Sequence, residues 1–192
     1  MEELNIEELI AKIKDADPKV RCAAWLSAGK YGVAAVAPLA KVMATGEMEV
    51  ARAAKRGLWV VVRHVGRPGA DKEKAPVVDA LCDLLGEEVP VEVRREVLWM
   101  LSEIGGDEAV WAIADMDNIL ENRDLREDAR GAVERIPGDE AVDTLQMGFD
   151  AAPEQYKVNM AQSLRARGVE VTGYPCQKLV PTKQTEVKPV GR

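Results

Sequence analysis

The sequence predicts an all-α fold, a right-handed α-solenoid of about four complete helix pairs. The first observation is a word of five residues, Gly106–Val110, which returns unchanged at 138–142, thirty-two positions later. Identical words about 20–50 residues apart are typical of stacked structural repeats. In this word we expect the glycine to end one helix and the aspartate to cap the next.

The second observation is a helical pattern that occurs in five copies, with starts near residues 20, 54, 93, 125 and 156. Each copy opens with an apolar residue, continues with a basic one, and reaches Gly or Pro twelve positions from its start. Apolar residues at 0, +4, +8 and usually +11 lie on one helical face. The first four copies are followed by a second helix that carries Val-x-x-Leu or a near equivalent, with its valine at Val36, Val78, Val110 and Val142. We therefore expect a repeat array over residues 1–168.

The two ends of the chain differ from these units. Asn5 is expected to cap a leading helix over residues 5–16, in which Ile6, Leu9, Ile10 and Ile13 form one apolar stripe. No helical period follows Gly168, so residues 169–192 are predicted to form an extended basic tail. Either the tail straps the last unit, as terminal caps of repeat arrays do, or it is an arm that orders on a partner.

Composition excludes several classes of protein. The net charge of −7 over 192 residues disfavours a nucleic-acid backbone as the main ligand, because such binders usually carry a basic face. Cys22, Cys82 and Cys176 are far apart and odd in number, which argues against a disulfide framework or a zinc site. The acidic N-terminus has no long apolar run, so we expect neither a secretory signal nor a membrane span, and a cytoplasmic location.

These features resemble HEAT-like repeats of the short kind named after the phycobilisome lyases. The matching words are Asp17–Arg21, Glu92–Arg95 and the repeated Gly-Asp-Glu-Ala-Val, and the resemblance covers about residues 17–168. It implies a helical array, but such arrays serve scaffolds, regulators and a few enzymes alike. In this family the basic residue after the first apolar position commonly ties neighbouring units together through acidic groups, a role that the resemblance gives to Arg21, Arg94 and Arg126.

The sequence gives little support to catalysis. The single histidine, His64, falls on the side of its helix away from the apolar face, where a solvated surface role is expected. Iron-binding members of this repeat class use His-Glu pairs, which the sequence lacks. It also lacks a nucleophile elbow, a phosphate loop and a dinucleotide fingerprint. We predict no catalytic residues, no cofactor and no metal site.

One stripe of residues is the predicted partner-binding site. Positions +1 and +5 from the first valine of each second helix point away from that helix's apolar face. Stacking aligns these positions on the surface lined by second helices, which is usually the concave, binding side. The predicted residues are Asp79, Asp83, Trp111, Asp115, Asp143 and Met147, with Ala37 and Lys41 equivalent in the first unit. Alternatively, the acids only keep the array soluble and Trp111 lies back over its neighbours.

The remaining tryptophans lie in first helices, Trp25 and Trp59 at position +5 and Trp99 at +6. Recurrence at one offset favours a structural wedge between units over a ligand site. Leu26, Val60 and Trp99 share position +6, opposite the apolar face, and are predicted as a second, convex patch for a partner. Lateral packing between helices is the equal alternative.

The sequence therefore predicts a non-catalytic protein–protein interaction scaffold that binds a basic or mixed segment of another protein on the second-helix surface. The family resemblance leaves open a bilin-lyase-like enzyme, or a subunit of one, that handles a tetrapyrrole. A remoter alternative is a nucleic-acid-binding HEAT-like module, which only the basic tail supports.

Overall fold

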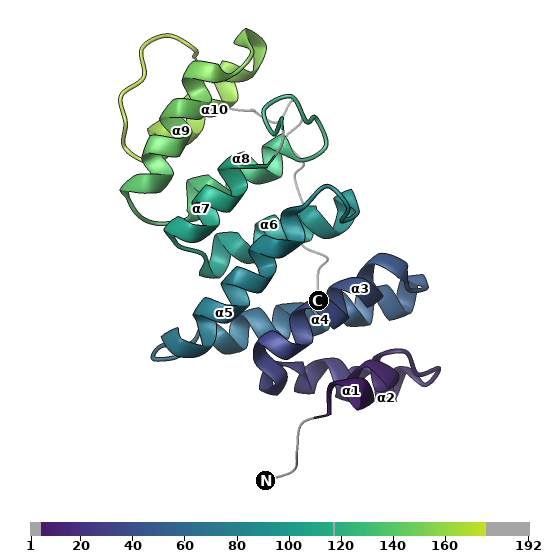
Figure 1. Cartoon of the computed structure of the whole chain (residues 1–192). Helices are drawn as coiled ribbons and strands as arrows, with labels where there is room; N and C mark the ends of the chain where they lie inside the picture. The colour runs from purple at the N-terminus through teal and green to yellow at the C-terminus, as the bar shows by residue number, and fades with distance from the viewer. Residues whose placement is uncertain (1–4, 117, 176–192) are drawn as a thin grey trace, which may run out of the picture.

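The structure, a computed structural model, describes residues 5–116 and 118–175. Its helices stack in chain order, from α1 and α2 at one end of the molecule to α9 and α10 at the other (Figure 1). The described residues contain no β-strand. The predicted all-α solenoid of helix pairs is confirmed.

One layer consists of the helices that open successive units, here called the first helices. They are α2 (Pro18–Ser27), α4 (Met48–Val65), α6 (Val91–Ile104), α8 (Arg126–Arg135) and α10 (Lys157–Ala166), and each contacts the next. The starts near 20, 54 and 93 fall inside the first three of these helices, and those near 125 and 156 directly precede the last two.

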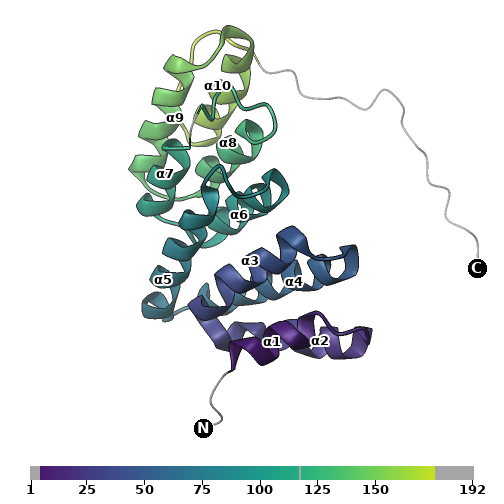
Figure 2. The ribbon, with the colours of Figure 1, turned by 45° about the vertical axis from the view of Figure 1, so that its right-hand side comes forward.

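The other layer consists of the second helices, α3 (Val36–Thr45), α5 (Asp71–Cys82), α7 (Asp107–Ala114) and α9 (Asp139–Ala151), which also contact one another in order. In Figure 2, α5, α7 and α9 lie toward the left of the array, and α6, α8 and α10 lie toward the right. Short 3-10 segments join the helices: η1 (Ala28–Ala35), η2 (Asp83–Leu85) and η3 (Glu154–Tyr156).

The leading helix α1 (Ile6–Ile13) packs against α2 and α3. As expected, the Asn5 side chain caps it, accepting hydrogen bonds from the backbone N–H groups of Glu7 (2.9 Å) and Glu8 (3.2 Å). Leu9 and Ile13 are buried. Because one side of α1 covers the first unit, it shields the end of the core.

Two local predictions are wrong. In the repeated word, Gly106 and Gly138 occupy the cap positions, and Asp107 and Asp139 are already the first helical residues, with no side-chain cap hydrogen bond. Each carboxylate therefore stabilises its helix through the positive N-terminal end of the helix dipole instead of as a cap. In the first unit, α2 ends at Ser27 and the chain continues as η1, so the α-helix does not run to Gly32.

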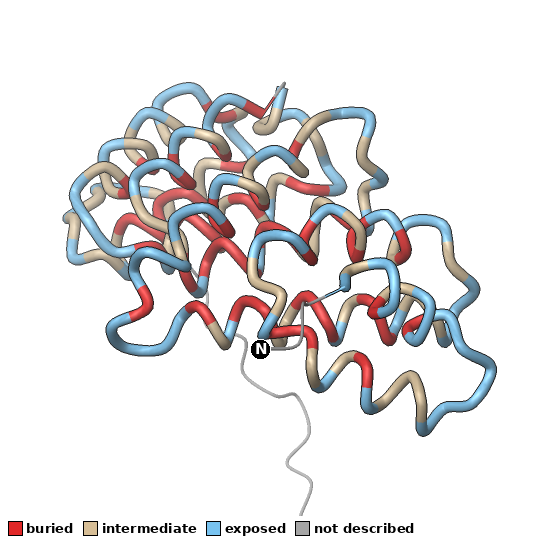
Figure 3. The backbone as a smooth tube through the Cα atoms, turned by 60° about the horizontal axis from the view of Figure 1, so that its bottom comes forward, coloured by how far each residue is buried: buried red, intermediate tan, exposed pale blue. Residues whose placement is uncertain are grey.

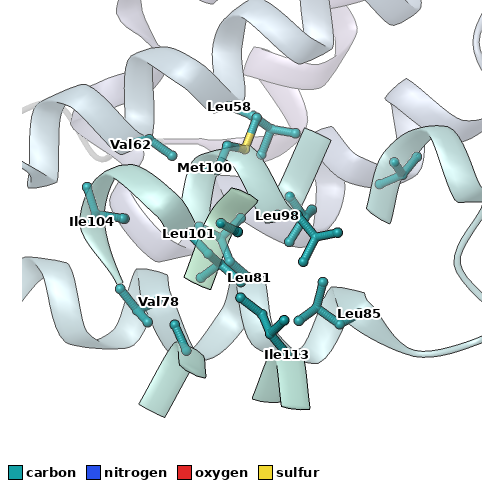
Figure 4. Packing of buried hydrophobic residues seen from close by; sticks show 14 of the residues in the cluster. Leu58, Val62, Val78, Leu81, Leu85, Leu98, Met100, Leu101, Ile104 and Ile113 are labelled. Carbon is teal, nitrogen blue, oxygen red and sulfur yellow. The ribbon is translucent and has the colours of Figure 1, made fainter. Parts of the chain in front are cut away.

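The core is continuous from unit to unit, because one cluster of buried side chains has members in both layers. Figure 3 marks the buried residues in red along the chain. Figure 4 shows one part of it, where Leu58 of α4, Leu81 of α5, Leu101 of α6 and Ile113 of α7 lie together, each at most 2% exposed. A side chain on Gly57 would come within 3.2 Å of Leu39 Cδ1, so this glycine permits the close approach of α4 and α3.

Candidate functional site

The six predicted partner-binding residues, here called the second-helix face, all lie exposed on consecutive second helices. Asp79 and Asp83 are in α5 and at its C-terminal end, Trp111 and Asp115 are in α7 and at its end, and Asp143 and Met147 are in α9. Trp111 is 53% exposed and Met147 is 72% exposed. Trp111 therefore does not lie back over its neighbours. Ala37 and Lys41 of the first unit are exposed as well.

The charge of this face is unbalanced. Within the described residues, none of its four carboxylates forms an ion pair or accepts a side-chain or backbone hydrogen bond (Asp79, Asp83, Asp115 and Asp143). The helices α7 and α9 contain aspartate and glutamate but no lysine or arginine. The face therefore presents uncompensated negative charge around two exposed apolar side chains.

Two acids on the first helices, Glu96 and Asp128, behave in the opposite way, because they join neighbouring units. In α6, Glu96 accepts a hydrogen bond from the indole N–H of Trp59 and lies 3.1 Å from Lys55 Nζ, both in α4. In α8, Asp128 accepts from Trp99 Nε1 (2.8 Å) and Arg95 Nε (2.9 Å), both in α6. A carboxylate of one unit is thus held by a basic residue and a tryptophan of the preceding unit.

The last junction uses other residues for the same purpose. Arg130 of α8 pairs with Glu127 and Glu134, and the Ser163 hydroxyl of α10 donates to Glu134 at 2.6 Å. Arg130 donates to Ser163 as well. Near the end of α10, Arg167 donates to the backbone carbonyls of residues 134, 136 and 138. From α4 to α10, hydrogen bonds therefore join each first helix to the next.

The predicted convex patch is not one uniform surface. Leu26 is 59% exposed, Val60 is half-buried, and Trp99 is 37% exposed with its indole N–H bonded to Asp128. The Trp99 ring also lies over Gly131 of α8. Trp99 thus packs laterally between units, as Trp59 does through Glu96, and only Leu26 is largely open to solvent.

The inter-unit role that the family resemblance gives to three arginines is wrong in detail. Arg21 donates to the backbone carbonyls of Asp15 and Ala16, in the turn before its own helix. Arg126 lies over the Tyr156 ring at 4.3 Å, a cation–π contact with the next unit and not an ion pair. Arg94 Nε is buried without a hydrogen-bond partner in the part of the chain that the structure describes.

An apolar cavity of about 250 Å³ adjoins the second-helix face, and the sequence pattern gave no sign of it. It lies between the third and fourth units and is lined from α7, α8, α9, α10 and the segment at 119–120. Met147 belongs both to the cavity lining and to the second-helix face. An apolar hollow beside an exposed methionine suits an apolar side chain of a ligand.

His64 and Cys82 lie outside the second-helix face. His64 Nε2 lies 3.6 Å from a Glu73 carboxylate oxygen, and the Arg67 guanidinium lowers the pKa of Glu73 by a direct hydrogen bond. Burial raises the pKa of the Cys82 thiol to about 11, aided by the negative charges of Glu108, Asp79 and Asp83. Among the described residues, no three His, Cys, Asp or Glu side chains are placed to hold a metal, and no described helix is long and apolar enough to cross a membrane.

The described part of the predicted tail, residues 169–175, returns to the last unit. Arg165 of α10 donates to the carbonyls of Val171 (2.9 Å) and Tyr174 (3.0 Å). The Tyr174 ring meets Phe149 of α9 edge-on at 5.3 Å, and its hydroxyl donates to Glu154. These residues form a strap over α9 and α10, and the rest of the tail lies outside the described residues.

No protein-family model and no curated protein sequence matches this chain. Two solved structures have a distantly similar arrangement. A crystal structure of an engineered protein is 20% identical, with a TM-score of 0.43 over 85% of this chain and 79% of that one. A designed armadillo repeat protein in complex with the peptide (KR)4 is 16% identical, with a TM-score of 0.41 over 86% of this chain and 88% of that one. The chain's own stacked helix pairs define it as a helical repeat protein.

Proposed function

We propose that this helical repeat protein is a non-catalytic scaffold that holds a partner protein on its second-helix face. The proposal is carried by the contrast between the two sides of the array. On the first helices, Glu96, Asp128 and Glu134 are bonded to the neighbouring unit. The four carboxylates of the second-helix face have no such partner among the described residues, so they are available to a ligand.

The apolar members of the face supply the anchors for binding. Tryptophan is among the residues that most often dominate binding energy, and Trp111 is 53% exposed. Met147 is flexible and polarisable, which lets it fit partner surfaces of different shape. A partner that covers these two side chains removes apolar surface from water. Each Å² of apolar surface so buried favours binding by about 25 cal/mol.

The charge of the face indicates the chemistry of the partner. Because α7 and α9 carry acids and no basic residue, they favour a segment with lysine or arginine beside an apolar side chain. Attraction between such surfaces speeds association and is screened by salt. We therefore expect the partner to bind more weakly as ionic strength rises.

We also propose that the units are HEAT-like. Two helices per unit, in place of the three of an armadillo unit, support this assignment.

Affinity capture from a lysate of the source cell tests the function, with captured proteins quantified by mass spectrometry. The unmodified chain is compared with a Trp111→Ala/Asp115→Ala variant and with a Glu47→Ala/Met48→Ala control. The control removes one exposed acid and one exposed apolar side chain from the start of α4, outside the second-helix face.

The expected result is a partner that the unmodified chain and the control capture and the Trp111/Asp115 variant loses, with equal helical circular dichroism in all three. Equal capture by all three proteins would contradict the site. The absence of any captured partner would contradict the scaffold function.

A further inference from the structure

The cavity beside Met147 opens at the edge of an acidic surface. Leu145, Met147 and Gly148 of α9 line it, and Met147 is exposed to solvent. Asp143 lies one turn before Met147, and Asp115 directly follows Ala114, which lines the cavity from α7. An occupant that reaches the cavity from this side passes carboxylates and then enters an apolar hollow.

The basic side chains of the cavity are already engaged. Arg130 pairs with Glu127 and Glu134, and Arg126 lies over the Tyr156 ring. They belong to α8, in the first-helix layer, whereas the acids belong to α7 and α9. The opening at Met147 therefore favours an occupant with positive charge on either side of an apolar segment.

The strap brings the chain close to this opening. Tyr174 contacts Phe149 near the C-terminal end of α9 and Glu154 at the start of η3, and Gly148 and Ala151 of α9 line the cavity. The described chain stops at Pro175, one residue later. The segment that follows therefore starts within a few residues' reach of the cavity.

We propose that residues 178–183 of this chain occupy the cavity, with Leu179 and Val180 as the apolar anchors and Lys178 and Lys183 near the acids of α7 and α9. The stretch reads Lys-Leu-Val-Pro-Thr-Lys, an apolar pair between two lysines, which matches the opening in charge and polarity. The five residues from Pro175 to Val180 span up to about 17 Å when extended, more than the diameter of a helix.

Attachment makes this contact favourable even where a free peptide would bind weakly. A short tether holds the segment at an effective concentration on the order of millimolar. Occupation of the cavity covers Met147, so the segment and an external partner compete for the same side chain. The inference does not depend on the proposed function, because it concerns one chain and its test needs no partner.

Methyl NMR of the full chain, labelled at its methionines, tests the contact. Met147 and Met160 both line the cavity, and Met43 lies in the first unit as an internal reference. The anchor variant is Leu179→Asp/Val180→Asp. The matched control, Gln184→Asp/Thr185→Asp, adds the same charge to the same stretch of chain but leaves the anchors in place.

We expect the anchor variant to shift the Met147 and Met160 signals and leave Met43 unmoved, while the control keeps all three signals at the positions of the unmodified chain. Unchanged Met147 and Met160 signals in the anchor variant would overturn the proposal. Equal shifts in both variants would overturn the role of the anchors. A difference that grows with protein concentration would assign the contact to a second copy of the chain and overturn docking within one chain.

Discussion

The indole N–H of Trp99 in α6 donates to Oδ1 of Asp128 in α8 over 2.8 Å, and Arg95 Nε donates to Oδ2 of the same carboxylate over 2.9 Å. The Asp128 side chain is largely buried at this junction. One carboxylate thus satisfies two donors of the preceding unit, and the stability of the array depends on it.

Replacing Asp128 with alanine should therefore destabilise the fold. We expect Asp128→Ala to lower the free energy of unfolding by about 2 kcal/mol, because two donors lose a charged acceptor. Urea denaturation measures the change. The matched variant Asp143→Ala removes an exposed carboxylate without a described partner and should change it by less than about 0.5 kcal/mol. Equal effects of the two substitutions would contradict the role of Asp128.

The two copies of the repeated word should respond differently to substitution of their glycine. Gly138 has φ of 111° and ψ of 165°, a conformation that is essentially restricted to glycine, whereas Gly106 has φ of −126°. A side chain at Gly106 would meet only the flexible end of Glu108. Gly138→Ala should therefore cost about 1–3 kcal/mol of unfolding free energy, and Gly106→Ala should cost less. Thermal and urea unfolding of both variants will measure this difference. A similar loss of unfolding free energy in the two variants would refute the prediction.

Fluorescence quenching reports the environment of Trp111 without any partner. Trp111 is the most exposed of the four tryptophans and lies among carboxylates, with Asp115 one turn away. Negative neighbours concentrate cations and repel anions. Caesium should therefore quench Trp111 more strongly than iodide does, relative to free tryptophan. Trp111→Phe should remove most of this difference. Stronger quenching by iodide would contradict an acidic surface at this residue.

Alkaline pH should weaken the fold through Cys82. Burial raises the pKa of this thiol to about 11, whereas an unfolded cysteine has a pKa of about 8.5. Between these values the folded state keeps a proton that the unfolded state loses, so the free energy of unfolding falls as pH rises. Burial also raises the pKa of Tyr156 to about 12, which extends the decline above pH 10 or so. Urea denaturation across this pH range should show that the free energy of unfolding of Cys82→Ala falls less steeply with pH than that of the unmodified chain. An equal fall in both proteins would rule out the Cys82 thiol as a cause.

The sequence predicted the repeat array and the exposure of the second-helix face, because both follow from helical periodicity. It did not predict the tryptophan–carboxylate contacts, whose partners are 37 residues apart at Trp59 and Glu96 and 29 apart at Trp99 and Asp128. Counted from the predicted starts, Trp59 and Trp99 fall at different offsets, yet they contact the next unit in the same way. The spacing of residues within one helix does not indicate which acid of the next helix lies opposite a given tryptophan.

The sequence did not predict the cavity either, for a related reason. Ile119 and Leu120 line it from the connection between α7 and α8, where the chain has no regular helical period. The other lining residues come from four different helices. The strap was one of the alternatives that the sequence left open, and the contacts of Tyr174 with Phe149 and Glu154 show its described part on the last unit.

The bonds between first helices also affect how the array deforms. Hydrogen bonds fasten α4 to α6, α6 to α8 and α8 to α10, whereas α3, α5, α7 and α9 share no hydrogen bond with one another among the described residues. From α4 to α10, the first-helix edge of the solenoid therefore resists changes of length, whereas the second-helix edge yields as its apolar contacts slide past one another. Bending about the stiff edge changes the spacing of Asp83, Asp115 and Asp143 without breaking a hydrogen bond. The density of negative charge that a ligand meets thus varies with the curvature of the molecule.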